Sequence, residues 1–156
     1  GPLELQLEDE IVRVWHPGKG HTDGDLVAYL VHRKLLVTGD LVTADMEPVI
    51  DLEAGGDVLA WAATLKGLLA LDFVTALPGH GAPIGRDTLV RLLAYLTLVE
   101  HEVTVAQRKG LSEDDVVAAV SIEQSPALEP VPFAANREKT VRLMDRALRA
   151  RRSTKE

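Results

Sequence analysis

Hydrophobic and polar residues alternate along the N-terminal part of the chain in the way that β-strands require. Residues 3–7 alternate with a period of two and predict a half-buried strand, and residues 11–15 predict a second one. Two apolar runs, residues 25–31 and 34–38, follow each other across a short polar break and predict a hairpin. A further short apolar run at residues 73–77 predicts one more strand. Together these patterns indicate a sheet.

Apolar residues recur at every third or fourth position farther along the chain, which predicts helices. Asp57 can cap a helix that begins at the next residue. A longer helix is expected over residues 87–108, and Gly110 is expected to end it. Strands followed by mixed strands and helices predict an α/β fold in which helices pack on a sheet. The expected inward-facing residues are Val58, Trp61, Ala62, Leu65, Leu68 and Leu69 in the first helix and Leu89, Leu92, Leu93, Leu96, Val99, Val103 and Ala106 in the second.

Residues 111–156 are expected to form a helical C-terminal extension of a single domain that spans residues 1–156. Ser112 is followed three residues later by an acidic residue, as at the start of a capped helix. Asn136 can cap a last helix, and the proline-containing segment 125–132 predicts a linker. The expected inner face of the last helix carries Val141, Met144 and Leu148.

The composition limits what fills the core and what could hold a metal ion. Apolar residues make up 46% of the 156 residues but aromatic residues only 4%, so Leu, Val and Ala must form most of the interior. Because there is no cysteine, the ligands of any metal must come from histidine and carboxylate side chains. No apolar run is long enough to predict a membrane span. Gly1 and Pro2 are typical of a scar left by protease cleavage, so the native N-terminus is not visible and the compartment is unknown.

The net charge of −7 conceals two regions of opposite sign. Residues 136–156 carry a net charge of +5, and residues 1–135 carry −12. A basic tail on an acidic body is compatible with nucleic-acid binding. The tail has no interleaved aromatic residues, however, so we favour a helix that docks on its own acidic body. Nucleic acid is therefore not an expected partner.

Three short motifs place metal-ligand types of residue beside glycine at the ends of predicted strands. A glycine-containing loop over residues 16–25 holds His21, the second strand of the hairpin is followed by Asp40, and a later strand is followed by His80. Strands fix positions and loops supply angles of approach, so such residues are suited to a metal site at a sheet edge. Imidazole and carboxylate are natural zinc ligands, and a carboxylate can bridge two ions.

These motifs resemble, in order and in spacing, those of the metallo-β-lactamase superfamily of metal-dependent hydrolases. The spacing is 19 residues from His21 to Asp40 and 40 residues from Asp40 to His80. The resemblance extends from about residue 12 to near residue 109, but the family's H-x-H-x-D-H motif is absent. The resemblance, together with the absence of this motif, implies that this chain is the C-terminal half of such a domain. The complete fold is an αββα sandwich of two similar halves, with the metal site at one edge between them. The three motifs read Gly20-His21-Thr22-Asp23-Gly24, Thr38-Gly39-Asp40 and Pro78-Gly79-His80-Gly81.

The resemblance also implies a role for each of the three residues. His21 would be the third histidine on a first zinc ion, Asp40 would bridge both ions, and His80 would complete the second. The other ligands belong to the missing motif, so each ion would have two protein ligands here, fewer than the three of a catalytic zinc site. The parent domain is then an enzyme with a small-molecule substrate, whereas this chain alone should not catalyse.

Each of these residues also has an ordinary structural interpretation. His21 and His80 could be plain turn residues beside glycine, and Asp40 could cap a turn at a strand end. Asp23 and Asp25 flank His21. A hydrogen bond that orients His21 is one role for either of them, and a local Asx turn is the commoner one.

The remaining histidines are weaker candidates. His16 could line a substrate cleft, although packing within the turn is favoured. His32 lies in the predicted hairpin turn and is expected to be exposed. His101 lies off the apolar stripe of the long helix and is expected to be solvated.

Two functions from different classes follow. The first is the C-terminal half of a binuclear zinc hydrolase that needs an N-terminal half as its partner. The family's reactions include β-lactam, thioester and phosphodiester cleavage, and aspartate rather than cysteine at position 40 favours the thioesterase and general-hydrolase branches. The second is a self-associating half-domain, because half of a sandwich exposes an apolar face. A two-fold homodimer of this kind could bind metal without turnover.

Overall fold

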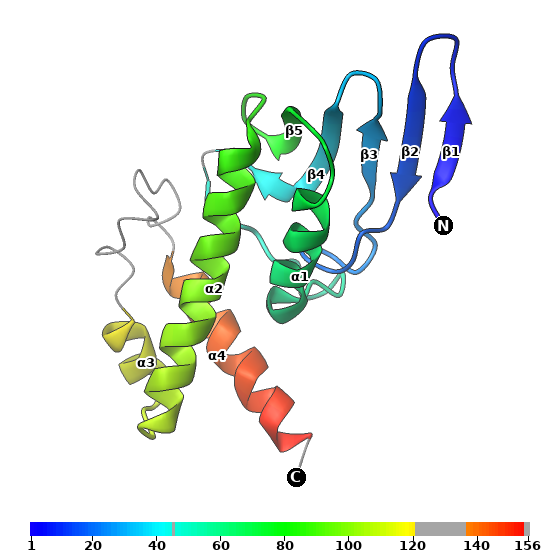
Figure 1. Ribbon diagram of the computed structural model, residues 1–156. Coiled ribbons are helices and arrows are strands. Elements are labelled where there is room, and N and C mark those ends of the chain that lie inside the picture. Colours follow the sequence, from blue (N-terminus) through cyan, green and yellow to red (C-terminus); the bar gives the residue numbers. More distant parts are fainter. Residues whose placement is uncertain (45, 121–136, 155–156) are drawn as a thin grey trace.

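Five β-strands form one sheet in the order β1-β2-β3-β4-β5, which is also their order in the sequence (Figure 1). The computed structural model describes residues 1–44, 46–120 and 137–154, so the predicted linker 125–132 and the predicted cap Asn136 lie outside the described residues. Strands β1 to β4 pair antiparallel, and β5 pairs parallel with β4. The strands are β1 (Leu3–Gln6), β2 (Ile11–Trp15), β3 (Val27–Leu30), β4 (Leu35–Thr43) and β5 (Thr75–His80).

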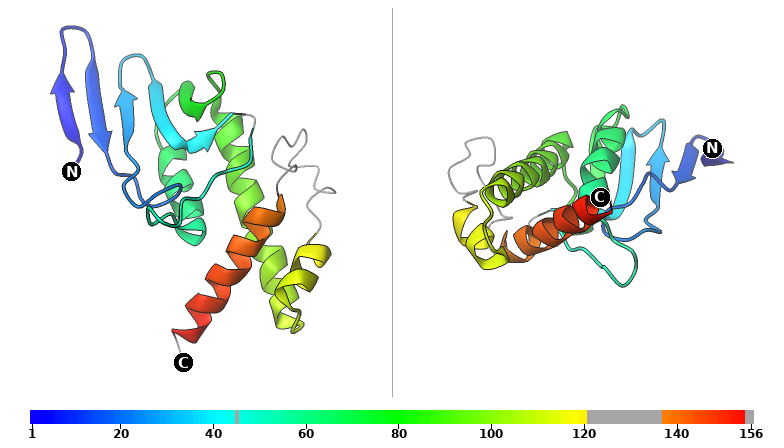
Figure 2. Two further views of the ribbon diagram at one scale, coloured as in Figure 1. Left: turned by 180° about the vertical axis from the view of Figure 1, so that it is seen from behind. Right: turned by 90° about the horizontal axis from the view of Figure 1, so that it is seen from below.

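Helices pack on one side of this sheet (Figures 1 and 2). Helices α1 and α2 contact each other, and α4 contacts α1, α2 and α3. The core lies between the helices and the sheet, and its largest buried side chains include Trp61, Tyr95 and Leu36. The helices described are α1 (Val58–Leu69), α2 (Arg86–Arg108), α3 (Glu113–Ala119) and α4 (Arg137–Ser153). This α/β arrangement of one mixed sheet covered by helices confirms the predicted fold class.

Two predicted helix starts, those at Asp57 and Ser112, are confirmed by their caps. The Asp57 carboxylate accepts hydrogen bonds from the N–H groups of Leu59 and Ala60 at 2.9 and 3.1 Å. The Ser112 hydroxyl accepts one from the N–H of Asp115 at 3.3 Å. Both caps satisfy N–H groups that have no partner within their own helix. The buried residues on the predicted inner faces are Leu89, Leu92, Leu96, Val99, Val103 and Ala106 in α2, and Val141, Met144 and Leu148 in α4.

The helices of the described residues cover only one of the two faces of the sheet. On β4, Leu36 and Thr38 are buried, whereas Leu35 and Val37, which point to the other side, are partly exposed. Directly paired residues of neighbouring strands share a face, so the pairing identifies the residues of the uncovered side. We call this surface the open face, and it is apolar at nearly every position. Its residues are Leu3, Leu5, Val12, Val14, Ala28, Leu30, Leu35, Val37, Thr75 and Leu77.

Three predictions about the strands are wrong. The predicted half-burial of the first strand is wrong because β1 is an edge strand with all four residues exposed. The prediction that Asp40 follows a strand end is wrong because β4 continues to Thr43, with irregular pairing on both sides of Gly39. His80 is the last residue of β5 rather than a loop residue after it. Both strands are longer than predicted because each supplies the other's pairing partner as far as Thr43 and His80.

The basic last helix docks on acidic residues of the same chain, as the charge distribution favours. Arg142 of α4 lies 3.0 Å from Glu113 and 2.8 Å from Asp114, both in α3. Arg151 lies 3.4 Å from Glu100 of α2. In the part of the chain that is described, no helix combines the length and the apolar character needed to cross a membrane.

Candidate metal centre

The structure brings His21, Asp40 and His80 together, although they come from a loop, a mid-strand position and a strand end. The Nε2 atom of His21 lies 3.5 Å from Oδ2 of Asp40. The Nε2 atom of His80 lies 3.4 Å from Oδ1 of the same carboxylate. His21 is the most enclosed of the three, with 19% of its side chain exposed, against 36% for Asp40 and 61% for His80. Asp40 is therefore the central member, with one imidazole at each of its oxygens.

The separations at Asp40 are compatible with a metal ion between each nitrogen and oxygen. Two ligand atoms bound to one tetrahedral zinc ion at ordinary bond lengths lie about 3.4 Å apart. The distances from Nε2 of His21 and from Nε2 of His80 to the nearer Asp40 oxygen, 3.5 and 3.4 Å, are close to this value. Each such position would have two protein donors. Within residues 1–44, 46–120 and 137–154, no group of three or more His, Asp or Glu side chains has the arrangement of a metal-binding cluster.

A carbonyl group of the loop after β4 orients the His21 imidazole. The Nδ1 atom of His21 lies 2.8 Å from the carbonyl oxygen of Val49. A carbonyl oxygen only accepts hydrogen bonds, so Nδ1 must carry the proton. In the neutral imidazole, Nε2 then has a free lone pair, and this atom faces Asp40. The distance of 3.5 Å between this nitrogen and Oδ2 of Asp40 leaves room for a metal cation between them, and metal-bound histidines commonly have a hydrogen-bond partner at the other ring nitrogen.

The backbone around His21 is fixed by two other segments. Its carbonyl oxygen accepts a hydrogen bond from the N–H of Asp51 at 2.9 Å, and the preceding carbonyl of Gly20 accepts one from the N–H of Asp57 at 3.0 Å. Gly20 also lies so close to the core that a Cβ atom there would approach Leu41 to 2.5 Å. A side chain at position 20 would therefore displace either this loop or the buried side chains of Leu41 and Trp61.

Glycine at position 79 makes room for the central carboxylate. A Cβ atom on Gly79 would lie 1.8 Å from Oδ1 of Asp40, well inside van der Waals contact. The next residue, His80, is held by its carbonyl oxygen, which accepts a hydrogen bond from the N–H of Ala44 at 3.0 Å. The parallel pairing of β4 and β5 thus sets Asp40 and His80 side by side.

The flanking aspartates have local roles. Asp25 accepts hydrogen bonds from the N–H and the hydroxyl of Thr22 at 3.0 and 2.6 Å, so its side chain makes a local contact within the loop, although not the predicted Asx turn. Asp23 is exposed, and its N–H donates to the carbonyl of Ala54 at 3.0 Å.

The other histidines take the structural roles that the sequence favours. His16 packs within its own loop, with Nδ1 at 2.8 Å from the carbonyl oxygen of Asp25. His32 and His101 have 55% and 69% of their side chains exposed. None of these three residues approaches the pair of imidazoles at Asp40 closely enough to join it.

Glu47 is a buried residue of this region that the sequence did not reveal. It lies in the loop after β4, and its Oε1 accepts hydrogen bonds from the hydroxyl groups of Tyr95 and Thr140. Burial raises the pKa of the Glu47 carboxyl above its usual value of 4.5, and the two hydroxyl donors counteract this rise in part. Its partners are 48 and 93 residues away, so no local pattern predicts the contact.

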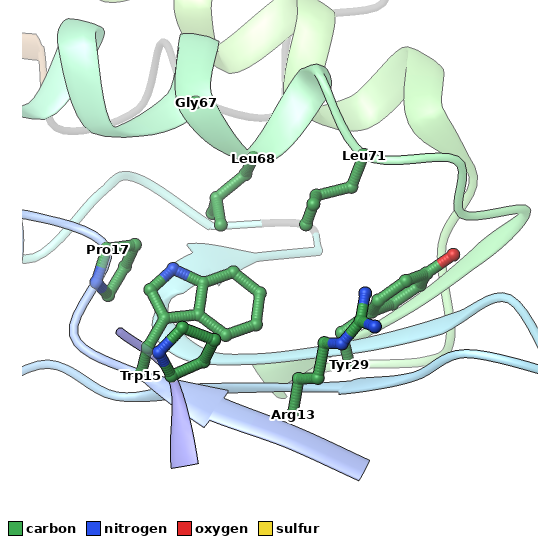
Figure 3. Close-up of a pocket in the computed structure, with 8 residues that line it drawn as sticks. Arg13, Trp15, Pro17, Tyr29, Gly67, Leu68 and Leu71 are labelled. Carbon is green, nitrogen blue, oxygen red and sulfur yellow. The ribbon is translucent and has the colours of Figure 1, made fainter. Parts of the chain in front are cut away.

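An apolar cleft of about 350 Å³ lies between the end of α1 and strands β2 and β3 (Figure 3). The indole of Trp15 lies below Leu68, and the guanidinium of Arg13 lies beside the ring of Tyr29. The side chains that line the cleft do not include the three candidate ligands. The cleft is therefore not part of the candidate metal centre.

Comparison with known sequences identifies the family of this chain. The sequence model of the Metallo-beta-lactamase superfamily matches residues 1–80, and the match ends at His80. A curated relative, "Metallo-beta-lactamase type 2" from Bacillus cereus, is 28% identical over 94 residues, which are 59% of this chain and 37% of that protein. The chain thus spans little more than a third of this relative.

Solved structures share the fold. A metallo-beta-lactamase from Pontibacter korlensis superposes with a TM-score of 0.51 at 24% identity, covering 62% of this chain and 46% of that chain. The stereoselective inverting sec-alkylsulfatase Pisa1 from Pseudomonas sp. superposes with a TM-score of 0.77 at 16% identity, covering 93% of this chain and 25% of that chain. The sequence match over more than half of the chain and the shared fold agree: this chain belongs to the metallo-beta-lactamase superfamily.

Proposed function

We propose that the chain is the C-terminal half of a binuclear zinc hydrolase. In this proposal His21 and Asp40 would hold a first zinc ion, and Asp40 and His80 would hold a second, so that Asp40 would be shared by both. The observation that carries the proposal is the position of the Asp40 carboxylate, with a different imidazole 3.4 to 3.5 Å from each of its oxygens. One carboxylate bridging two ions would give this arrangement.

The chemistry follows from the donor set. Bound zinc would lower the pKa of a coordinated water from about 15.7 to about 7, which supplies a nucleophile for hydrolysis at neutral pH. The contribution of this chain is to present neutral imidazole nitrogens and a carboxylate at fixed separations. The Val49 carbonyl holds the His21 proton at Nδ1 and so leaves Nε2 free to bind a metal ion.

The proposal includes an N-terminal half as partner. Each zinc position would have two donors from this chain, and the missing donors are expected from the H-x-H-x-D-H motif. The open face supports this partner, because it is apolar across all five strands and no helix of the described residues covers it. In an αββα sandwich, the corresponding face packs against the second sheet.

We propose esters and thioesters as the substrate class to examine first, with β-lactams, phosphodiesters and sulfate esters as the alternatives. Aspartate at position 40 favours the thioesterase and general-hydrolase branches of the family. The relatives' names, a metallo-β-lactamase and a sec-alkylsulfatase, widen the range of substrates that a screen should contain.

Reconstitution tests this function. The chain is mixed with an N-terminal half that carries the H-x-H-x-D-H motif, zinc is added, and hydrolysis of ester, thioester, β-lactam and sulfate-ester substrates is followed. We expect turnover that depends on both halves and on zinc, and that falls by at least about a hundredfold in an Asp40→Asn variant. Equal rates with zinc alone and with the mixed halves would contradict the proposal.

The open face also favours a second candidate, a homodimer whose two open faces pack together. Such a dimer would bury the apolar surface without an N-terminal half, and it could bind metal without turnover. Analytical ultracentrifugation of the chain alone distinguishes the candidates. A dimer that persists after the N-terminal half is added would favour the homodimer, and its replacement by a heterodimer would favour the hydrolase half.

A further inference from the structure

We propose that Glu47 is a positioning residue through which helices α2 and α4 set the orientation of the His21 imidazole. The expected effect on metal binding rests on the proposed function, but the orientation of the His21 imidazole can be observed without metal. The proposal assigns a role to the C-terminal helix, which lies outside the part of the chain that matches the family.

The contacts of Glu47 tie one loop to two helices. Its side chain is buried, with 8% of the residue exposed. Its Oε1 accepts hydrogen bonds from the hydroxyl of Tyr95, in α2, and from the hydroxyl of Thr140, in α4, the latter at 2.5 Å. Two donors from different elements converge on one oxygen atom, so they fix the position and the direction of the side chain together.

Two residues farther along the same loop lies the carbonyl group that orients His21. Val49 accepts the Nδ1–H of His21 at 2.8 Å. Between Glu47 and Val49 stands Pro48, whose ring fixes one of the backbone torsion angles in the connection. A displacement of Glu47 is therefore expected to move the Val49 carbonyl rather than to be absorbed between them.

The other hydrogen bonds of this loop anchor it to β4 and to the His21 loop rather than to the helices: the Thr43 hydroxyl donates to the carbonyl of Met46 at 3.0 Å, and the N–H of Asp51 donates to the carbonyl of His21 at 2.9 Å. The side chains of Met46 and Val49 are 43% and 40% exposed. Ile50 is buried, but apolar contacts are non-directional and do not determine how a neighbouring carbonyl points. Among the described residues, the hydrogen bonds of Glu47 are the directional contacts of this stretch with the two helices.

The two carboxylate oxygens of Glu47 differ in their partners. Its Oε2 is buried and has no hydrogen-bond partner among the described residues. A buried polar atom without a partner lowers stability, whereas Oε1 is the acceptor for the buried hydroxyl groups of Tyr95 and Thr140. A carboxyl at this position is explained if its Oε1 is required as the acceptor that aligns the loop.

The experiment compares Glu47→Leu, Glu47→Gln and a matched control, Gln107→Leu, in the full chain without metal. Gln107 is equally buried, with 8% exposed, and its amide also joins α2 to α4 by donating to Asp145 Oδ1 at 2.7 Å. It has no contact with the loop that carries Val49 among the described hydrogen bonds. The control therefore removes a helix–helix hydrogen bond without touching the proposed connection.

The readout is the protonation pattern of the His21 imidazole by long-range ¹H–¹⁵N NMR at about pH 8, where histidine is neutral. The His21 signals are identified by their loss in His21→Gln. We expect the wild type, Glu47→Gln and Gln107→Leu to carry the proton at Nδ1. In Glu47→Gln the side-chain amide carbonyl still accepts both hydroxyl groups, so the loop keeps its alignment. We expect Glu47→Leu to show both tautomers.

A wild type without the Nδ1 proton, or a folded Glu47→Leu with an unchanged His21, would overturn the inference. An equal change in Gln107→Leu would overturn it as well. If Glu47→Leu does not fold, the double variant Tyr95→Phe/Thr140→Val, which removes both donors, decides in the same way.

Zinc affinity of the complex with the N-terminal half is the second readout. We expect Glu47→Leu to bind zinc about tenfold more weakly than the wild type and Glu47→Gln to restore the affinity. If the wild-type complex binds no zinc, the proposed function fails, while the NMR result still decides the role of Glu47.

Discussion

Gly79 lies directly against the Asp40 carboxylate, and a Cβ atom at this glycine would approach Oδ1 to 1.8 Å. The two residues belong to adjacent parallel strands, β4 and β5. The absence of a side chain at position 79 is thus what permits Asp40 to stand between the two imidazoles. The next residue in the chain, His80, is one of them.

Gly79→Ala should displace the Asp40 carboxylate and weaken metal binding by the assembled site. We expect a loss of about 1–3 kcal/mol in the free energy of unfolding, because the inserted methyl group overpacks the contact. We also expect zinc affinity to fall about tenfold or more, since a bridging ligand has moved. Chemical denaturation and zinc titration measure the two effects.

The control for this prediction is Gly67→Ala. Gly67 lies inside α1, and nothing stands within 4 Å of an added Cβ there. Alanine should stabilise this helix by about 0.5–1 kcal/mol and leave zinc affinity unchanged. Equal zinc affinity in Gly79→Ala and the wild type would show that Asp40 does not need this space.

Substitutions at two neighbouring residues of β4 should differ strongly in their effect on the free energy of unfolding. Leu35 belongs to the open face, whereas Leu36 is fully buried beneath the helices. Leu35→Lys should change the free energy of unfolding by less than about 1 kcal/mol, and Leu36→Ala should lower it by about 2–5 kcal/mol.

Association with a partner should be weakened more by Leu35→Lys than by Leu36→Ala. Leu35→Lys places a charge on the open face and should weaken binding to the N-terminal half, or to a second copy, by about tenfold or more. Sedimentation of the variant against the wild type measures this. Unchanged association of Leu35→Lys would mean that the open face is not the docking surface.

Glu47→Gln should alter how stability depends on pH. Burial raises the pKa of Glu47 in the folded state above the usual 4.5. At pH values between 4.5 and this raised pKa, the folded state therefore binds more protons than the unfolded state. The contribution of protonated Glu47 to the free energy of unfolding is fully present below pH 4.5 and is lost as the pH rises through the pKa of Glu47 in the folded state. The wild type should therefore lose stability relative to Glu47→Gln as the pH rises.

Thermal unfolding of both proteins from pH 4.5 to about pH 8 measures this difference. The midpoint of the variant should rise relative to that of the wild type across this range. Parallel curves for the two proteins would show that Glu47 does not titrate with a raised pKa.

Local patterns predict most of the elements of this fold. The cap at Asp57 and the apolar stripe of α2 depend on neighbours in the sequence, and both are confirmed. The extension of β4 to Thr43 could not be predicted, because it depends on pairing with β5, a strand from a distant part of the chain. The exposure of β1 likewise follows from its place at the edge of the sheet, which periodicity does not reveal.

The candidate site could also be predicted only in part from the sequence. His21, Asp40 and His80 were identified by their resemblance to family motifs, and the chain folding that brings them together is not contained in their spacing. The Val49 carbonyl and Glu47 could not be found from the sequence. A backbone acceptor has no residue-type signal, and the partners of Glu47 lie in helices far along the chain.

The proposed function requires His21, Asp40 and His80 to bind two zinc ions that share Asp40. Zinc content per protomer after the chain is combined with an N-terminal half, separated from free metal and compared with a His21→Ala/His80→Ala variant, tests it most directly. We expect about two zinc ions per wild-type complex and a loss of most of this zinc in the double variant. Equal zinc content in the two complexes would contradict it.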